Sequence, residues 1–259
     1  MSKNNLIIKF LGTGTSQGVP VIGCSCKVCS STSPFNNRLR SSILITKKNT
    51  SVVVDTGPDF RQQMLNNKVR HLDAVLYTHE HKDHVAGLDD VRAFNFLQKK
   101  PMDVFCSDQV FECLKREYRY IFDEAFKYPG IPKVDRYKLE NKTFTYKDME
   151  IQPILVKHYQ LPVFGFRIEN FCYITDASFI AEDEKLKLKN LDVLVINALR
   201  KEKHISHFNL EEALAIIDEL KPKKAYLTHI SHLLGTHEEI AKELPENVFL
   251  AHDQLSLTL

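Results

Sequence analysis

The 259-residue sequence has no apolar run long enough to cross a membrane as a helix. Its first apolar segment, residues 6–10, contains Lys9 and is too short for a secretory signal peptide. A cytoplasmic location is therefore the default expectation. The formal net charge is only +2, so the composition indicates no general attraction to nucleic acid or to an anionic membrane surface. Neither is expected as a partner.

The chain also lacks short-period repeats, low-complexity segments and any Pro/Gly/Ser-rich linker between its halves. With 43% hydrophobic and 26% charged residues, it has the composition of an ordinary globular protein. We expect one domain over residues 1–259. An aromatic and basic stretch near residues 115–137 reads as an insertion that covers a substrate, as an oligomer contact, or as a helix whose aromatic side chains pack inward.

Six cysteines are present, and the absence of a leader argues against a disulfide framework. Cys106, Cys113 and Cys172 have apolar neighbours and are expected as small buried hydrophobic residues. The remaining three crowd into one loop, near residues 24–29. Cys24, Cys26 and Cys29 have a spacing that suits one tetrahedral zinc ion, but a closed site needs a fourth ligand. Three free thiols in a flexible loop are the alternative.

The chain is organised around residues 78–84, which contain three histidines and two carboxylates. The apolar run 73–77 before them is typical of a short buried strand, so the cluster leaves the carboxyl end of that strand. Spacings of one or two residues suit a metal held by an irregular loop, unlike the helical zinc motif with histidines four apart. The alternative is a solvated polar turn.

Strand and helix patterns alternate in each half of the chain. The glycine-rich turn at residues 12–18 does not match a nucleotide-binding pattern, so we interpret it as a turn that lets the backbone pass close to a site. Leu88, Val91, Phe94 and Leu97 predict one apolar helix face. The expected strands are 6–11, 41–46, 51–55, 73–77, 104–106, 143–146, 149–157, 164–168, 171–175, 191–196, 224–228, 248–251 and one at the carboxyl terminus. The expected helices are 58–66, 87–100, 108–120, 210–220 with Asn209 as N-cap, and 237–244.

Seven metal-binding side chains fall just after predicted strands. They are His79, His81, Asp83, His84, His158, Asp176 and His229. A single histidine after a strand is structural more often than not, so the argument rests on the set. If the sheets carry these strand ends at one edge, the side chains converge there.

The order HxHxDH, then His, then Asp, then His resembles the metallo-β-lactamase superfamily, and the resemblance runs through most of the chain. The turn at residues 11–15 followed by the three clustered cysteines is similar to the phosphonate-operon phosphodiesterases, which open phosphoribosyl cyclic phosphates. The resemblance implies an α+β fold, a four-layer αβ/βα sandwich of two mixed sheets with helices on the outer faces.

By the same resemblance, the seven side chains hold two metal ions, either zinc or manganese. One ion takes His79, His81 and His158, the other takes Asp83, His84 and His229, and Asp176 bridges them. A homodimer is common among such relatives, so a homodimer is a possible assembly of this chain.

The resemblance also assigns residues outside this set. His232 completes a Cys₃His structural zinc, for which Ser231 and His237 are alternatives. His207 matches the family's general acid, and a histidine at a helix start is the alternative. Asp55 fits a carboxylate that orients a ligating imidazole.

Two metal ions suit hydrolysis of a small phosphodiester by a metal-bridging hydroxide. A cyclic ribosyl phosphate is one candidate substrate. The alternatives are a tRNA 3′-processing type of endonuclease and an oxidative enzyme similar to the pyrroloquinoline-quinone biosynthesis branch. Arg38 and Arg40 are interpreted as loop surface charges or as phosphate ligands. Lys82 and His252 raise the same question.

Overall fold

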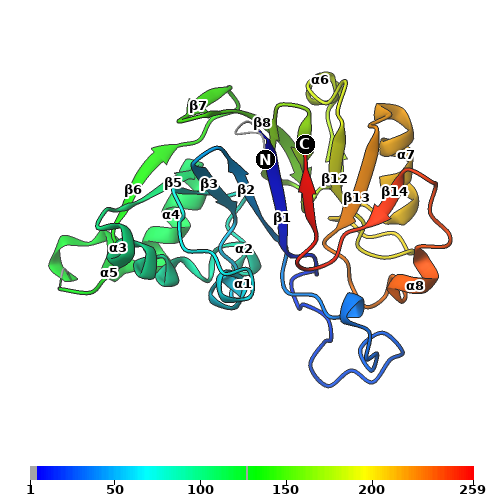
Figure 1. Cartoon of the computed structure of the whole chain (residues 1–259), viewed down its shortest axis with the longest axis horizontal. Helices are drawn as coiled ribbons and strands as arrows, with labels where there is room; N and C mark the ends of the chain where they lie inside the picture. Colours follow the sequence, from blue (N-terminus) through cyan, green and yellow to red (C-terminus); the bar gives the residue numbers. More distant parts are fainter. Residues whose placement is uncertain (1–4, 127) are drawn as a thin grey trace. The chain divides into compact units, whose positions relative to one another are not determined.

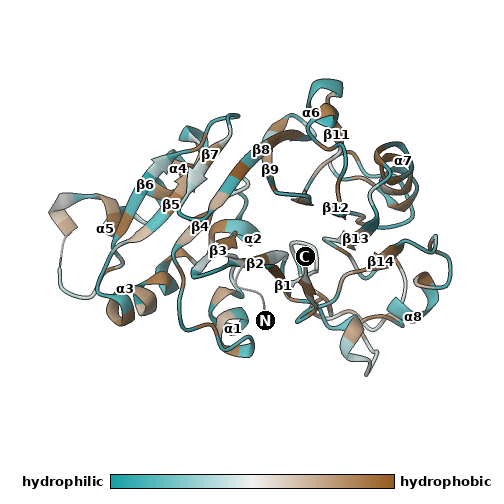
Figure 2. Ribbon diagram, turned by 45° about the horizontal axis from the view of Figure 1, so that its top comes forward, coloured by the Kyte–Doolittle hydropathy of each residue, from teal (hydrophilic) through white to brown (hydrophobic). Residues whose placement is uncertain are grey.

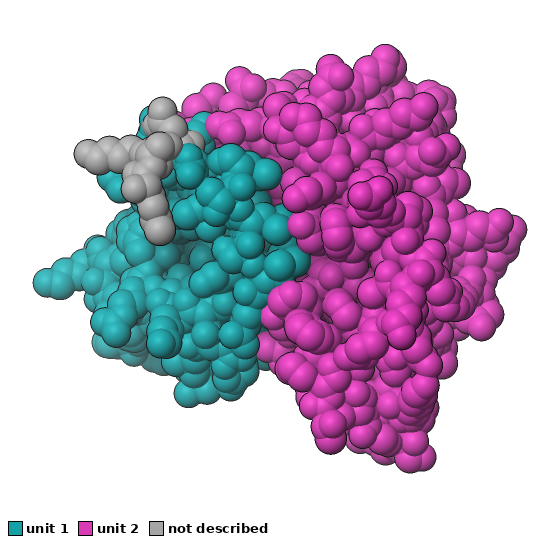
Figure 3. Space-filling model, turned by 45° about the vertical axis from the view of Figure 1, so that its right-hand side comes forward, with its two compact units in different colours: residues 1–11, 42–140, 254–259 teal, residues 12–41, 141–253 magenta. Residues whose placement is uncertain are grey.

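A computed structural model describes residues 5–126 and 128–259. The chain divides into two compact units, which Figure 3 shows in two colours. Unit 1 comprises residues 1–11, 42–140 and 254–259, and unit 2 comprises residues 12–41 and 141–253. Both units are therefore discontinuous in sequence. Within the described residues, no helix combines the length and the apolar character that a membrane crossing requires.

Unit 1 is built on a seven-stranded mixed sheet (Figure 1). Its strand order is β15 (Ser256–Thr258), β1 (Leu6–Gly12), β2 (Ser42–Lys47), β3 (Thr50–Val54), β4 (Ala74–Leu76), β5 (Met102–Cys106) and β6 (Val134–Lys138). The predicted hairpin of β2 and β3 is confirmed, and Lys48 turns it with a φ of 52°. From β3 to β6 the strands are parallel, so their carboxyl ends share one edge. All three residues of β4 are buried, as its continuous apolar sequence predicts.

The helices of unit 1 are shorter than predicted. They are α1 (Phe60–Asn66), α2 (Lys82–Val85), η2 (Leu88–Val91), α3 (Arg92–Gln98), α4 (Asp108–Glu117), α5 (Arg119–Phe122) and η3 (Glu124–Phe126). The single helix expected over 87–100 is wrong, because it divides into η2 and α3. Leu97 is 69% exposed and does not join the buried face of this segment. The helix expected over 108–120 is interrupted at Tyr118, whose φ of −118° and ψ of 46° are not helical.

The aromatic residues of the 115–137 stretch fall into two groups. Tyr118, Tyr120 and Phe122 pack against the core of unit 1, as the inward-packing interpretation predicts. Tyr128 and Tyr137 are exposed instead. Tyr137 belongs to β6, a strand that the sequence reading missed in this stretch. Lys127 lies outside the described residues.

Unit 2 contains an eight-stranded mixed sheet. Its order is β11 (Phe179–Ile180), β8 (Met149–His158), β9 (Leu161–Ile168), β10 (Phe171–Tyr173), β12 (Val193–Asn197), β13 (Lys224–Thr228) and β14 (Val248–Leu250), and β7 (Phe144–Tyr146) pairs with β8. From β10 to β14 the neighbouring strands are parallel, whereas β9 is antiparallel to both of its neighbours, β8 and β10. Buried and exposed residues alternate over much of β8, whose mixed hydropathy can be followed in Figure 2.

The remaining helices belong to unit 2. They are η1 (Pro34–Asn36), α6 (Glu182–Leu186), α7 (Leu210–Leu220) and α8 (His237–Ile240). The prediction for α7 is confirmed, and Asn209 caps it in a capping box with Glu212. Ala213 and Ile217 of α7 bury themselves in the same core as β12 and β13. The helix expected over 237–244 is wrong in length, because α8 is a single turn.

Candidate metal centres

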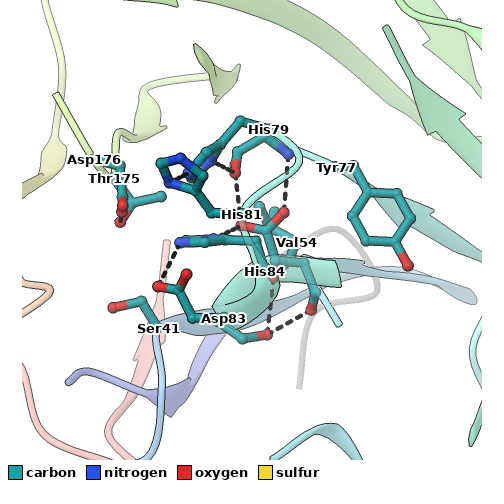
Figure 4. Close-up of polar contacts among 12 residues, drawn as sticks. Ser41, Val54, Tyr77, His79, His81, Asp83, His84, Thr175 and Asp176 are labelled. Atoms are coloured by element: carbon teal, nitrogen blue, oxygen red, sulfur yellow. Dashed lines mark hydrogen bonds and ion pairs between the residues drawn. The ribbon is translucent and has the colours of Figure 1, made fainter. Parts of the chain in front are cut away.

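Unit 1 contributes four of the predicted ligands, which directly follow β4. His79 Nε2 lies 3.0 Å from His81 Nδ1, and His84 Nε2 lies 3.1 Å from Asp83 Oδ2 (Figure 4). Ligand bonds of about 2.0–2.2 Å place neighbouring ligand atoms about 3 Å apart. Each pair therefore has the spacing of one edge of a coordination shell. Only part of this segment is an irregular loop, because Asp83 and His84 lie in the one-turn helix α2.

The buried carboxylate of Asp55 orients the imidazoles of His84, directly, and His79, through Thr78. Asp55 Oδ2 lies 2.6 Å from His84 Nδ1, and the Asp55 carboxylate accepts hydrogen bonds from both the amide and the hydroxyl of Thr78, each at 2.9 Å. Because the Thr78 hydroxyl donates to Asp55, it is left to accept from His79 Nδ1, which lies 2.9 Å away. Both rings thus direct Nδ1 to other protein groups, and Nε2 is the nitrogen that a metal ion would take. Burial raises the pKa of Asp55, and His84 opposes this rise.

Gly87 allows α2 to pack tightly against the turn after β3. Its amide donates to Thr56 O at 2.7 Å, and the Thr56 amide donates to His84 O at 2.8 Å. A Cβ atom at residue 87 would lie 2.3 Å from Gly57 O, a distance that no side chain tolerates. The glycine after the ligands is therefore a steric requirement.

Unit 2 contributes the other three predicted ligands. His158 is the last residue of β8, while Asp176 and His229 follow β10 and β13. Asp176 Oδ1 lies 3.0 Å from His229 Nδ1, which is again the edge of a coordination shell. His158 Nδ1 donates to Ser206 O at 2.6 Å, so Nε2 is the nitrogen that a metal ion would take. His229 Nε2 lies 3.3 Å from the hydroxyl of Thr15.

Three residues of the candidate metal centres, Asp55, Asp176 and His229, have left-handed backbone conformations. The φ angles are 65° at Asp55, 56° at Asp176 and 55° at His229. Residues other than glycine adopt this region rarely, at a cost of about 1–3 kcal/mol each, and such strain concentrates at functional sites. Each residue lies within three positions of the end of a strand. The left-handed conformation therefore changes the direction of its side chain from the alternating pattern of the strand.

His207 lies among the ligands of unit 2. Its ring centroid is 4.4 Å from that of His158 and 4.8 Å from that of His229. Its Nδ1 is buried and has no hydrogen-bond partner among the described residues. Burial lowers the pKa of His207 to about 3, with a further contribution from His229. The ring is therefore neutral at neutral pH in the protein alone.

The glycine-rich turn, predicted to let the backbone pass close to a site, lies beside the segment that contains His229. The amide of Gly14 donates to Leu39 O at 2.8 Å, and that of Thr15 donates to Ile230 O at 3.1 Å. A Cβ atom at residue 14 would be 3.0 Å from Arg38 O, so the backbone segments touch. This approach brings Thr15 to His229. Sequence reasoning missed Thr15 and Thr78, and their only signal is their position next to a glycine or a ligand.

The three clustered cysteines and His232 meet within unit 2. The Sγ atoms of Cys24, Cys26 and Cys29 lie 3.4, 3.4 and 3.5 Å from His232 Nδ1. Tetrahedral zinc, with Zn–S of about 2.3 Å and Zn–N of about 2.0 Å, requires such separations, so these residues fit the ion. Hydrogen bonds from the Cys29 amide and His232 lower the pKa of Cys26 to about 6, which favours its thiolate, whereas burial raises the pKa of Cys29 to about 11.

The alternative fourth ligands point elsewhere. Ser231 Oγ accepts a hydrogen bond from the Leu233 amide at 3.1 Å, and His237 Nδ1 lies 3.2 Å from the guanidinium of Arg38. Of the ligands considered, His232 is the one that faces the thiols. All six cysteines are free of disulfides, and Cys106, Cys113 and Cys172 are buried, as predicted.

The side chains considered for phosphate binding have protein partners. The interpretation of Arg38 as a surface charge is wrong, because it is buried and donates to Thr13 Oγ1 at 2.8 Å and to the carbonyl of Ala251. Arg40 Nε donates to Ser16 O at 3.1 Å. Lys82 forms an ion pair with Glu117 of α4, and His252 Nδ1 donates to Asp253 O at 3.0 Å.

Substituting Cys26→Ser is expected to release one zinc ion per chain and to lower the melting temperature, because a structural zinc contributes directly to folding. Zinc content and thermal unfolding measure both effects. Cys172→Ser, a buried cysteine away from this cluster, serves as the control for a thiol lost from the core. Unchanged zinc content in Cys26→Ser would contradict the site.

Comparison with known proteins identifies the class. A family model of the beta-lactamase superfamily domain matches residues 50–230. An octanoyltransferase of Porphyromonas gingivalis (strain ATCC BAA-308 / W83) is 36% identical over 249 residues, which cover 95% of this chain and 50% of that protein. The chain thus spans about half the length of that relative.

Among solved structures, a diphosphatase from the PhnP family matches with a TM-score of 0.92 and 36% identity, covering 98% of this chain and 97% of its own. Zinc-bound PqqB from Methylobacterium extorquens matches with a TM-score of 0.78 and 20% identity, covering 98% of this chain and 100% of its own. The second likeness concerns the fold alone.

The fold and the His/Asp ligand sets define a protein of the metallo-β-lactamase superfamily. The predicted fold class, the αβ/βα sandwich of two mixed sheets, is confirmed. Within that superfamily the chain belongs to the PhnP family of metallo-hydrolases.

Proposed function

We propose that the chain is a metal-dependent hydrolase of small phosphodiesters whose histidine and aspartate ligands hold two divalent ions. By the resemblance, His79, His81 and His158 would hold one ion, Asp83, His84 and His229 would hold the other, and Asp176 would be a ligand of both. The observation that carries the proposal is the spacing of 3.0–3.1 Å between paired ligand atoms in each unit. One such spacing also suits a hydrogen bond, so the argument rests on three such pairs among histidine and aspartate side chains that follow strand ends.

Two divalent ions, when bound, would lower the pKa of a coordinated water and would neutralise charge that develops on phosphoryl oxygens. Mixed imidazole and carboxylate ligands admit both zinc and manganese. The chain's own residues hold the rings in place. Asp55, Thr78 and the Ser206 carbonyl each accept from an Nδ1 atom, which keeps the ligating Nε2 atom deprotonated.

His207 is the proposed general acid that protonates the leaving oxygen. Burial lowers its pKa to about 3, so in the protein alone the ring carries no proton to give. The role therefore requires the bound phosphodiester to raise that pKa, since an anion within about 4–6 Å favours the charged imidazolium. The buried Nδ1 of His207, which has no partner among the residues described, supports a ring held for a ligand.

The substrate class follows from this chemistry. A cyclic ribosyl phosphate is the first candidate, from the resemblance to the phosphonate-operon phosphodiesterases. A diester of diphosphate is the second, because the matching PhnP-family structure is that of a diphosphatase. Hydrolysis at phosphorus is common to both. Octanoyl transfer is not proposed, since the protein of that name is about twice as long as the matched region.

A substrate panel tests the proposal. Protein loaded with zinc or manganese is assayed with bis(p-nitrophenyl) phosphate, a ribosyl cyclic phosphate, a cyclic nucleotide and a diphosphate diester. We expect metal-dependent release of product from at least one, and chelation should abolish it. If fully loaded protein turned over none of the four, the proposal would fail.

A further inference from the structure

His204 has no role in the chemistry described so far, yet it begins the turn that contains His207 and contacts another residue of that turn. This turn, residues 204–207, lies in unit 2 between β12 and α7. His204 Nδ1 accepts two hydrogen bonds from Ser206, one from its amide at 3.3 Å and one from its hydroxyl at 3.2 Å. The imidazole of His204 therefore stabilises the turn by hydrogen bonds within it.

The same serine contacts the proposed metal ligand His158. Ser206 O accepts from His158 Nδ1 at 2.6 Å, so this carbonyl sets the orientation of the ligating ring. His207 follows directly in the chain, and its ring centroid lies 5.2 Å from that of His204. A single residue, Ser206, thus connects His204 to a proposed ligand and to the proposed acid.

The far end of the turn is fixed independently. The Phe208 amide donates to Ala177 O at 2.7 Å, and Phe208 O accepts from the Leu199 amide at 3.0 Å. No such backbone bond is recorded within the described part of the chain for the amides of residues 204–207. The side chain of His204 therefore supplies the restraint that the backbone does not.

We infer that His204 is a positioning residue. Its Nδ1 holds the amide and hydroxyl of Ser206, so that the Ser206 carbonyl orients His158 and the next residue, His207, is held in place. The inference rests on the proposed function for the roles of His158 and His207. It adds a residue that touches neither a metal nor the substrate. An acceptor at the Nδ1 position is the requirement, not an imidazole as such.

The neutral form of the ring meets this requirement. Burial lowers the pKa of His204, with a further contribution from Arg200, so its Nδ1 lone pair is available near neutral pH. An amide N–H donates to this atom, which places the ring's own proton on Nε2.

Three variants separate the acceptor from the ring. His204→Ala removes the acceptor, His204→Asn places an amide oxygen near the Nδ1 position, and His204→Gln carries its amide further out, near Nε2. Exposed Ile205 provides the control variant Ile205→Ala in the same turn. Calorimetric titration with Mn²⁺ measures metal affinity in protein with the Cys₃His site already filled by zinc, and kcat is measured on the best substrate.

We expect His204→Ala and His204→Gln to lower Mn²⁺ affinity about 10- to 100-fold and to lower kcat, because contacts behind a ligating histidine have effects of this size. His204→Asn should recover most of both, and Ile205→Ala should change neither. Equal affinity in all variants would overturn the inference, as would His204→Asn behaving like His204→Gln. If His204→Ala does not fold, the Asn and Gln pair decides.

The affinity measurement distinguishes this inference from the proposed function. If the wild-type protein binds Mn²⁺ but hydrolyses no phosphodiester, the proposed function fails. The affinities of the His204 variants would still support or overturn the positioning role.

Discussion

Substituting Asp83→Ala is expected to lower kcat for phosphodiester hydrolysis by at least about 10³-fold, which corresponds to about 4 kcal/mol of transition-state stabilisation. Asp83 Oδ2 lies 3.1 Å from His84 Nε2, and its removal deletes one of the paired ligand atoms of unit 1. The affected ion is lost or displaced, and with it the activation of water. Turnover and metal content per chain measure the two effects.

The Cys₃His zinc should remain in Asp83→Ala, because all four of its ligands belong to unit 2. Glu80→Ala is the matched control. Glu80 is a carboxylate within the same motif, but its Oε1 accepts from Gln109 Nε2 at 2.7 Å. The Glu80→Ala variant should hydrolyse phosphodiesters at the wild-type rate. Loss of every metal together with folding in Asp83→Ala would contradict two separate kinds of site.

Substituting His207→Ala is expected to slow hydrolysis about 10²- to 10⁴-fold for substrates with poor leaving groups, the usual contribution of a general acid. An alkoxide leaving group needs a proton as the bond to phosphorus breaks. A p-nitrophenolate needs little protonation, so p-nitrophenyl esters should lose much less. The ratio of the two rates, measured on alkyl and p-nitrophenyl diesters, is the quantity to compare.

The histidine control is His71→Ala, a residue of unit 1 that is half exposed and paired with Asp73. It should leave both rates as they are. An equal loss on both classes of substrate in His207→Ala would remove His207 from the acid role. It would indicate instead that the buried ring shapes the site around His158 and His229.

Elements with one clear periodic pattern were predicted well. The strand β13 matches its predicted bounds, and so does α7 with its Asn209 cap. In both, the local pattern and the burial in the tertiary structure agree. Errors arose where the two diverge. Leu97 has the helical spacing of a core residue, but α3 ends at Gln98, and Leu97 is exposed.

Other local errors have the same cause. Tyr118 interrupts a predicted helix. Its hydroxyl donates to Val85 O at 2.9 Å, a contact that the local sequence around Tyr118 does not predict. Arg38 looks like a loop charge, yet the segments that surround it come from residues 13 and 251. Long-range packing outweighs propensity in both cases.

The sequence by itself determined the kinds of candidate ligand and their order, because metal-binding side chains and predicted strand ends can be read directly from the sequence. The order of the motifs also indicated the fold class, through the resemblance to the metallo-β-lactamase superfamily. Only the tertiary structure decided which nitrogen each imidazole presents, since Asp55, Thr78 and Ser206 are distant in sequence from some of the rings they hold. Likewise, His232 meets the cysteines across more than 200 residues. Such choices depend on contacts between distant segments, and no local pattern encodes them.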